Sequence, residues 1–481
     1  MKKGFEFTFP LVPRISMSSF TLTPRSRFTV TARPPDALSI SNRALLIAAL
    51  AEGETVFDCQ CQRREMLTVM QQLGVRIDID EPGRRMTVFG CGGIFPEKSA
   101  EIVLRQCDAT ARFLTAALAF TDGDYRIAGA GRLAHLSMAD LLFPLGQLGT
   151  EVISERGNDN LPLHIIGVRG KEGTVESLAR YGMTADRSGR GGRFAVVSGH
   201  ITSQYLSALL LAAPVGAQNG NVELHVVNEL VDRPFVRMTL AMMKRFGIDL
   251  QSSIGTTHVL LSKGITFTVP QGSVYQGQRL TIEPEALGAN CLFAGAALLG
   301  GEATVEGISE NSLQGDIDFI YCLRRMGCTV TFEQAAENGA SRDSVTVRRD
   351  PDVPLRGINV DMNELADSVP LLATLACFAE NPTKISNVGY LRLRDGDRLA
   401  LLVGELRKLG AHIDELPDGL TIHPGSELHG AELESHDDHR LAMGLAIAGL
   451  AVPGVTIHGA EAAALVWPEY FEFLEGLATP S

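Results

Sequence analysis

The sequence predicts an α/β protein of two domains, each built from repeated units in which helices alternate with strands. Three observations lead to this fold class. The chain has 481 residues, which is long for one ordinary hydrophobic core. Apolar residues make up 45% of it and charged residues 21%, as in folded globular proteins. At five places an apolar helical pattern ends in a glycine and passes into an alternating, strand-like segment.

The five glycines recur at similar intervals. Successive glycines are 75, 98, 80 and 83 positions apart, which is too long for a solenoid repeat and fits a unit of a few strands and two helices. The preference of helix-to-strand loops for glycine would explain any single site, but five sites in the same context indicate a repeated architecture. The sites are "LGVRIDID" at Gly74, "LGTEVISE" at Gly149, "FGIDLQSS" at Gly247, "MGCTVTFE" at Gly327 and "LGAHIDEL" at Gly410. The polar stretch "VPQGSVYQGQRL" between the third and fourth units is the predicted linker.

Composition and charge argue against several classes of protein. A net charge of −13 disfavours a nucleic-acid surface, which needs an excess of Lys and Arg. The eight cysteines are scattered without a CxxC pair, so we expect reduced thiols. The N-terminus lacks the apolar region of a signal peptide, and the longest apolar run, "LAMGLAIAGLAVPGV", is short for a membrane span. We therefore expect a cytoplasmic protein with no membrane or nucleic-acid partner, and nothing calls for a cofactor.

Polar residues open three apolar helices of the first half. The free N–H groups at a helix start favour an anion, and an arginine there has the wrong charge for the helix dipole. Ordinary N-caps and a solvated arginine are the alternative for each helix taken alone. Three such starts together predict a converging anion pocket. The residues are Ser39, Ser41, Asn42 and Arg43 in "ALSISNRALLIAALAEG", Arg112 in "QCDATARFLTAALAF", and Thr202, Ser203 and Gln204 in "ITSQYLSALLLAAP".

The second half carries acid–base groups at helix starts. Carboxylates in this position are usually caps, which is the alternative interpretation for each of them. Arginines beside them favour recognition of a carboxylate or a phosphate. "HDDH" lacks another cluster at ligand spacing, so no metal site is predicted. The residues are Asp367 in "ELADSVPLLATLACFAE", Arg394, Asp395, Asp397 and Arg398 in "RLRDGDRLALLVGELRKLG", and His436, Asp437, Asp438, His439 and Arg440 in "ESHDDHRLAMGLAIAG".

These segments together resemble the enolpyruvyl (carboxyvinyl) transferase family, and within it the EPSP synthases most closely. The resemblance runs from about residue 30 to residue 475 and also includes "ELVDRPFVRMTLAMMKRFG", "NSLQGDIDFIYCLRRMG" and "WPEYFEFL". It implies an inside-out fold, in which each domain has three βαβαββ repeats around buried helices and a cleft separates the domains. On this basis we expect a first domain over residues 37–277, and a second over residues 1–36 together with 278–481.

The resemblance also implies roles for single residues. The family transfers the enolpyruvyl group of phosphoenolpyruvate (PEP) to a hydroxyl of shikimate 3-phosphate by addition and elimination. Arg43 and Gln204 match groups that hold the ring substrate, and Thr202 and Ser203 match hydroxyls that bind its phosphate. Asp367 and Asp395 match proton-transfer carboxylates. Arg398, His439 and Arg440 match the side that binds the carboxylate of PEP.

The sequence departs from the family pattern where phosphate should bind. Leu38, Leu136 and Leu465 stand at the positions of a lysine, an arginine and a lysine that surround the phosphate of PEP. A serine that holds the ring phosphate is replaced by Asp232, and a nearby tyrosine by Phe235. A glycine that backs PEP corresponds to Asp108 in a looser part of the alignment. Burying a phosphate without cations is costly, so the pocket is predicted to suit carboxylates and hydroxyls.

Three functions remain open from the sequence. The first is a diverged enzyme of a specialised biosynthetic pathway that acts on a shikimate-like carboxylated hydroxy-ring by elimination or addition–elimination. Asp367 and Asp395 would move the protons in this reaction, and the arginines would stabilise the negative charge that develops. The second is the family reaction, 3-phosphoshikimate 1-carboxyvinyl transfer, with Arg394 and Arg398 partly replacing the lysines. The third is a binding protein that kept the fold without the chemistry. The expected partner is a small carboxylated ring, with or without PEP, and the sequence gives no oligomeric state.

Overall fold

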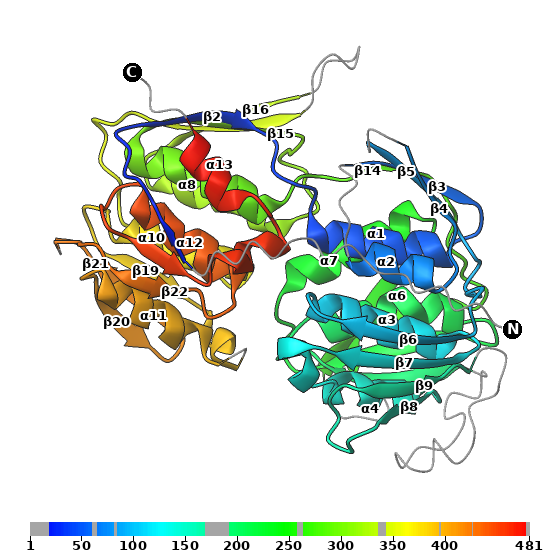
Figure 1. Cartoon of the computed structure of the whole chain (residues 1–481). Helices are drawn as coiled ribbons and strands as arrows, with labels where there is room; N and C mark the ends of the chain where they lie inside the picture. The colour runs from blue at the N-terminus through cyan, green and yellow to red at the C-terminus, as the bar shows by residue number, and fades with distance from the viewer. Residues whose placement is uncertain are drawn as a thin grey trace, which may run out of the picture.

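Two lobes make up the fold, and in each of them sheets surround buried helices (Figure 1). The structure is a computed structural model that describes residues 19–59, 65–80, 84–168, 192–256, 263–334, 343–393, 396–425 and 427–477. The predicted α/β class and the inside-out arrangement are confirmed, because the central helices of both lobes are buried along nearly their whole length. None of the described helices is long and apolar enough to cross a membrane.

The first lobe contains three four-stranded sheets. In each sheet two parallel strands are followed by an antiparallel hairpin, which is the βαβαββ pattern once the helices are added. The first sheet has β14 (Arg279–Thr281), β3 (Glu54–Asp58), β5 (Arg85–Phe89) and β4 (Ile77–Asp80), with α1 (Leu38–Leu50) and α2 (Glu65–Gln72). The second has β6 (Ser99–Leu104), β7 (Asp124–Gly129), β9 (Leu163–Ile166) and β8 (Glu151–Ser154), with α3 (Asp108–Phe120), the 3-10 helix η1 (Gly131–His135) and α4 (Ala139–Gln147). The third has β10 (Arg193–Ser198), β11 (Val222–Val227), β13 (Lys263–Val269) and β12 (Gln251–Thr256), with α6 (Gln204–Gly216) and α7 (Arg233–Arg245).

The second lobe repeats this plan, except that its last sheet has three strands. The first sheet has β16 (Thr329–Glu333), β17 (Ser344–Arg349), β15 (Gly301–Glu306) and β2 (Phe28–Ala32), with α8 (Ala286–Leu299), η2 (Gly315–Asp318) and α9 (Phe319–Arg325). The second has β18 (Asn359–Asp361), β19 (Thr383–Ser386), β21 (Gly419–His423) and β20 (His412–Leu416), with η3 (Ala366–Ser368), α10 (Val369–Ala376), η4 (Gly389–Leu393) and α11 (Arg398–Lys408). The third has β1 (Ser19–Thr21), β23 (Thr456–His458) and β22 (Glu432–Glu434), with α12 (His439–Gly449), η5 (Ala460–Leu465) and α13 (Tyr470–Gly476).

Each of the five predicted helix–glycine–strand junctions is confirmed. The glycines end α2, α4, α7, α9 and α11, and a strand of the outer hairpin follows each of them. All five have positive φ angles, between 78° and 110°, which a residue with a Cβ atom rarely adopts. The local sequence pattern therefore reports a real backbone requirement.

The chain passes between the lobes twice, and the two crossings lie side by side. After β2 it leaves the second lobe for α1, and after β14 it returns to α8 (Figure 1). Asp36 and Pro284 form an isolated antiparallel bridge, and the backbone N–H of Ala37 donates to the carbonyl oxygen of Glu283 at 2.8 Å. β14 pairs with β3 in the first lobe, although it lies beyond residue 277, where the predicted first domain ends.

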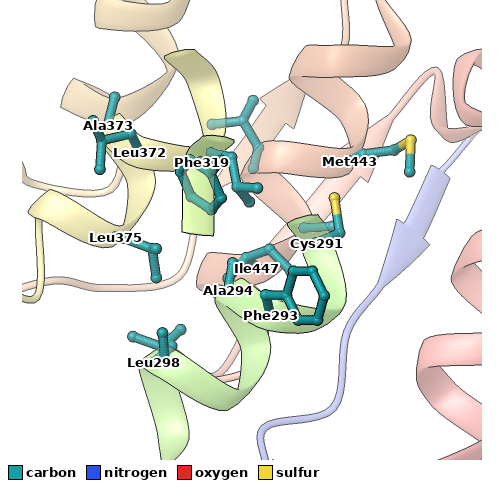
Figure 2. Close-up of a cluster of buried hydrophobic side chains, with 14 of the residues drawn as sticks. Cys291, Phe293, Ala294, Leu298, Phe319, Leu372, Ala373, Leu375, Met443 and Ile447 are labelled. Atoms are coloured by element: carbon teal, nitrogen blue, oxygen red, sulfur yellow. The ribbon is translucent and has the colours of Figure 1, made fainter. Parts of the chain in front are cut away.

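Each lobe has its own hydrophobic core. The core of the first lobe runs from Ala37 to Ile282, and that of the second combines Leu22, Phe28 and Val30 with residues from Ala286 to Leu474. Figure 2 shows side chains from α8, α9, α10 and α12 in the second core, among them Phe293, Phe319, Leu372 and Ile447. Two of these helices, α10 and α12, begin beside the predicted site residues Asp367, His439 and Arg440, so the packing of apolar helices positions these polar groups.

Candidate active site

Hydrogen bonds connect the starts of the central helices in the first lobe. Asn42 on α1 donates through Nδ2 to the hydroxyl of Thr110 on α3 at 3.3 Å. Arg112 on α3 donates through a terminal guanidinium nitrogen to Oε1 of Gln204 at the start of α6. The structure thus brings together the three polar helix starts that the sequence singled out.

Arg43 lies beneath this group with its guanidinium almost fully buried. Its Nε donates to the hydroxyl of Thr239 at 2.8 Å, and its other nitrogens donate to the carbonyl oxygens of Ser39 and Phe235 and, at 3.4 Å, to the hydroxyl of Ser207. Burial lowers the pKa of Arg43 to about 9. No carboxylate of the described residues forms an ion pair with it, so the partners that the buried charge has among them are neutral oxygens.

Three buried polar atoms near these helix starts lack hydrogen-bond partners among the described residues. They are Oδ1 of Asn42, Nε of Arg112 and the hydroxyl of Ser203. Thr202 is also buried, and its hydroxyl accepts from the backbone N–H of Gln204 at 3.3 Å. Because a buried polar atom without a partner costs free energy, this set fits a site that a polar ligand completes.

The start of α1 corrects one expectation. Helix α1 begins at Leu38, so Ser39, Ser41 and Asn42 lie within its first turns and do not cap it. The cap is Glu285 from the start of the second lobe, whose Oε2 accepts the backbone N–H of Leu38 at 2.8 Å. The sequence signal for a helix start was right, but the capping group comes from a residue 247 positions away.

In the second lobe, Asp367, Asp438 and two arginines form one charged network. Arg440 pairs with both carboxylate oxygens of Asp367, and another of its guanidinium nitrogens lies 3.3 Å from Oδ1 of Asp438. Nε of Arg398 lies 3.3 Å from Oδ2 of Asp438. Asp438 also caps α12 by accepting the backbone N–H of Arg440 at 2.9 Å. The network fixes the position of the predicted acid–base group Asp367.

Charge and burial determine the protonation states of this network. Burial alone would raise the pKa of Asp367, but the charge and hydrogen bonds of Arg440 hold it below the usual range. The same balance, with Arg440 and Arg398 against burial, holds the pKa of Asp438 below its usual range. Burial and then the charge of Arg440 lower the pKa of His439 to about 3. At neutral pH both carboxylates are therefore ionised, whereas His439 is neutral and serves only as a hydrogen-bonding group.

The depressed pKa of His439 predicts a pH dependence of stability. Between pH 6.5 and about 3 the unfolded chain binds a proton at this residue and the folded chain does not. The contribution of neutral His439 to the free energy of unfolding is therefore fully present above pH 6.5 and is lost as the pH falls toward 3. The slope of unfolding free energy against pH measures how many more protons the unfolded chain binds than the folded chain. We expect His439→Gln to lower this number by about one between pH 4 and 6. His412→Gln is the control, because His412 is exposed, and an equal loss of slope there would contradict the prediction.

Two predicted residues, Arg394 and Asp395, lie outside the described residues. Their neighbour Asp397 caps α11 by accepting the backbone N–H of Ala400 at 3.0 Å, and it also pairs with Arg392. In the "HDDH" segment, His436 turns to Glu405 with a distance of 2.9 Å between Nε2 and Oε1. Among the described residues no group of three potential ligands gathers in a way that would hold a metal ion.

Comparison with known proteins decides the family. The family model for EPSP synthase (3-phosphoshikimate 1-carboxyvinyltransferase) matches residues 22–474. The chain belongs to the EPSP synthase family. It is an enzyme of that carboxyvinyltransferase family, and the predicted resemblance is confirmed.

Relatives from plants and bacteria match nearly the whole chain. The chloroplastic 3-phosphoshikimate 1-carboxyvinyltransferase of Petunia hybrida is 34% identical over 473 residues, which cover 95% of this chain and 85% of that protein. The enzyme of the same name from Cupriavidus necator is 34% identical over 476 residues, covering 96% and 100%. The solved structure of EPSP synthase from Acinetobacter baumannii superposes with a TM-score of 0.74 at 23% identity, covering 96% of this chain and 98% of that one. This last similarity concerns the fold.

The three leucines that we predict to stand in place of cations of the EPSP synthase pattern lie in apolar surroundings. Leu136 is a buried member of the first core, whereas Leu38 and Leu465 are half-buried and pack against the second core. Phe235 lies beside Arg43, with the guanidinium carbon 5.9 Å from its ring centroid. Asp232 is buried at the N-cap position of α7. None of the three leucines offers a charge or a hydrogen bond from its side chain.

Two charged residues of the first lobe were not predicted as a pair. Asp108 is the first residue of α3, and its carboxylate accepts two hydrogen bonds from Arg132 of η1, at 2.6 and 3.2 Å. Arg132 stands in "GAGRLAHLS", which has no helix-start pattern, so the sequence offers no signal for it. Glu285 was also missed, although it precedes the apolar run "ALGANCLFAGAALLG" just as Asp367 precedes its own helix.

The two lobes come into contact next to these groups. Arg237 on α7 forms two hydrogen bonds, at 3.1 and 2.8 Å, with the carboxylate of Glu364, three residues before Asp367. The charge of Arg398 in the second lobe also acts on Asp108 in the first and helps to lower its pKa. The helix starts of the first lobe and the charged network of the second therefore face one another.

Proposed function

We propose that this member of the EPSP synthase family acts on a shikimate-type carboxylated hydroxy-ring by elimination or addition–elimination and does not depend on a tightly bound PEP. The observation that carries the proposal is the apolar packing of Leu38, Leu136 and Leu465. A phosphate carries nearly two negative charges at neutral pH, and its desolvation needs cations or strong donors close by. Leucine supplies neither.

The charge balance of the described site supports the same conclusion. Five guanidinium groups belong to Arg43, Arg112, Arg132, Arg398 and Arg440, and four carboxylates belong to Asp108, Asp232, Asp367 and Asp438. One positive charge remains in this set. That excess suits a single carboxylate, whereas shikimate 3-phosphate and PEP together bring two carboxylates and two phosphates.

The arrangement supports a stepwise elimination of water from the ring. Asp367, ionised and held by Arg440, is the proposed base that removes a proton from a ring carbon. The electron pair of the broken C–H bond is then shared with the ring carboxylate, whose added charge the neighbouring guanidinium groups stabilise. The C–O bond of a ring hydroxyl breaks next. Asp395 gives a proton to the departing oxygen, which leaves as water. His439 contributes a neutral hydrogen bond.

The proposed binding groups lie in the first lobe. We assign Arg43 to the ring carboxylate, and we assign to the rest of the ring the donors and acceptors of Ser39, Thr202, Ser203, Gln204 and Arg112. The unpaired buried atoms of Asn42, Arg112 and Ser203 support this assignment. Asp232 and the hydroxyls of Thr202 and Ser203 would contact ring hydroxyls in place of a phosphate, because a second anion next to Asp232 is repelled.

The family reaction is the second candidate. The chain is 34% identical over 95% of its length to a plant enzyme named for that reaction, and Arg112, Arg132 and Arg398 are cations near the site. Conversion of PEP and shikimate 3-phosphate, with release of phosphate, would require Arg394, Arg398 or these cations to replace the lysines.

One experiment separates the candidates. The purified protein is incubated with unphosphorylated shikimate alone, and in parallel with shikimate 3-phosphate and PEP, while ring acids and free phosphate are measured. We expect loss of shikimate with a new ring acid one water lighter, and negligible phosphate release. Phosphate release at ordinary enzyme rates, about 1–10³ per second, would overturn the proposal in favour of the family reaction. Ring-acid binding without turnover in either mixture would leave a binding protein.

A further inference from the structure

We propose that Asp108 is a specificity-determining residue, whose carboxylate occupies the anion position between Arg132 of the first lobe and Arg398 of the second and so keeps a phosphate-bearing co-substrate out. The inference rests on the proposed function and names what sets the substrate class of the same site. It starts from a contact that the sequence did not predict, the bidentate pair of Asp108 with Arg132.

The geometry of Asp108 is that of a bound anion. Its side chain is 17% exposed, and both of its carboxylate oxygens accept hydrogen bonds from the fork of Arg132. A guanidinium fork of this kind binds a carboxylate or a phosphate in the same bidentate way. Since Asp108 takes both donors, an incoming phosphate would find them in use.

A second arginine near Asp108 is also committed within the first lobe. Arg112, one turn further along α3, donates to Gln204 and lies with its guanidinium carbon 4.8 Å from the ring centroid of Tyr205. Burial alone would raise the pKa of Asp108, but the hydrogen bonds from Arg132 and the charges of Arg112 and Arg398 lower it overall. Asp108 is therefore ionised at neutral pH and partly neutralises three cations at once.

The position of Asp108 between the lobes makes this charge decisive for ligands. The charge of Arg398 in the second lobe acts on it, and Arg398 also pairs with Asp438. A ligand with a phosphate group that entered between Arg132 and Arg398 would bring two negative charges next to an ionised carboxylate. A neutral hydroxyl or the ring itself meets no such repulsion, so Asp108 selects against phosphate without closing the site to a hydroxy-ring.

The test compares two variants of Asp108 with the wild type in the full-length protein. Asp108→Asn keeps the shape and one acceptor but removes the charge, and Asp108→Gly removes the side chain and with it both oxygens to which Arg132 donates. PEP and inorganic phosphate are the probes, and their affinities are measured by titration calorimetry at one fixed ionic strength. We expect both variants to bind PEP at least tenfold more tightly than the wild type, with Asp108→Gly binding inorganic phosphate more tightly as well.

Controls separate this effect from a general loss of negative charge. Asp108→Glu keeps the charge and should bind PEP as weakly as the wild type. Asp122→Asn removes a half-buried carboxylate two residues beyond the C-terminal end of α3, where it pairs with Lys98, and should also leave PEP affinity unchanged. Equal PEP affinities in wild type, Asp108→Asn and Asp108→Gly would overturn the inference, and so would a tenfold gain in Asp122→Asn. Circular dichroism establishes that each variant is folded, and Asp108→Asn, which keeps the volume of the side chain, serves if the glycine variant is not.

The inference and the proposed function can fail separately. Turnover of shikimate by the wild type tests the function, and the ratio of PEP affinities between Asp108→Asn and wild type tests the role of Asp108. Shikimate turnover with an unchanged ratio leaves the function standing and removes Asp108 as the selective residue. If Asp108→Asn binds PEP tenfold more tightly than the wild type and shikimate is not turned over, Asp108 stands as the residue that excludes phosphate. The proposed reaction is then wrong.

Discussion

Asp367→Asn is expected to lower turnover of the ring acid by a factor of about 10²–10⁴, which is the usual contribution of a positioned general base. The amide keeps the volume of the carboxylate and can still accept a hydrogen bond from Arg440, but it cannot take a proton. The lowered pKa of Asp367 means that the wild-type group is already ionised at neutral pH, so the substitution removes the active form. The measurement is the initial rate of loss of shikimate at saturating concentration.

Two comparisons make this result specific to Asp367. Asp352→Asn changes an exposed aspartate of the same lobe and should leave the rate unchanged. The affinity for the ring acid should fall less than the rate in Asp367→Asn, because we assign the binding of the ring to Arg43 and the helix starts of the first lobe. A rate within twofold of the wild type would show that another group removes the proton.

Arg440→Ala is expected to destabilise the second lobe by about 3–5 kcal/mol, because removal of one partner from a buried ion pair leaves the other charge uncompensated. Arg440 pairs with Asp367 and Asp438, whose side chains are 16% and 12% exposed, so the substitution strands two carboxylates. The only tryptophan of the sequence, Trp467, lies in the core of the same lobe. Its fluorescence during urea unfolding therefore reports the stability of this lobe.

Matched arginine variants test the reason for the effect. Arg348→Ala, on the exposed face of β17, should change the free energy of unfolding by no more than about 0.5 kcal/mol. Arg440→Lys keeps the charge but not the bidentate contact, so its stability should lie between those of the alanine variant and the wild type. Raising the pH from 4 to 7 should increase the loss of unfolding free energy in Arg440→Ala relative to the wild type. At pH 7 both stranded carboxylates, Asp367 and Asp438, are ionised in the unfolded and folded chains. A loss independent of pH would indicate a packing effect.

Much of the fold could be predicted because its signals are local. The glycines at 74, 149, 247, 327 and 410 are needed where the backbone turns with a positive φ, and a helix before and a strand after each of them are visible in adjacent residues. The polar runs before the apolar helices marked where α1, α6, α10 and α12 begin. The strand exchange was less visible, since β14 completes a sheet whose other strands lie about 200 residues earlier in the chain.

The same distinction between local signals and contacts of distant segments applies to the candidate site. By itself the sequence determined which side chains stand at helix starts, and the family resemblance predicted that three leucines stand in place of cations. Only the tertiary structure decided that Glu285 caps α1, that Arg440 joins Asp367 across 73 positions, and that Arg132 holds Asp108. A helix start depends on the few residues that follow it, whereas an ion pair depends on where distant segments pack and on how little water remains between them. Which charges are free for a substrate is therefore a property of the folded chain.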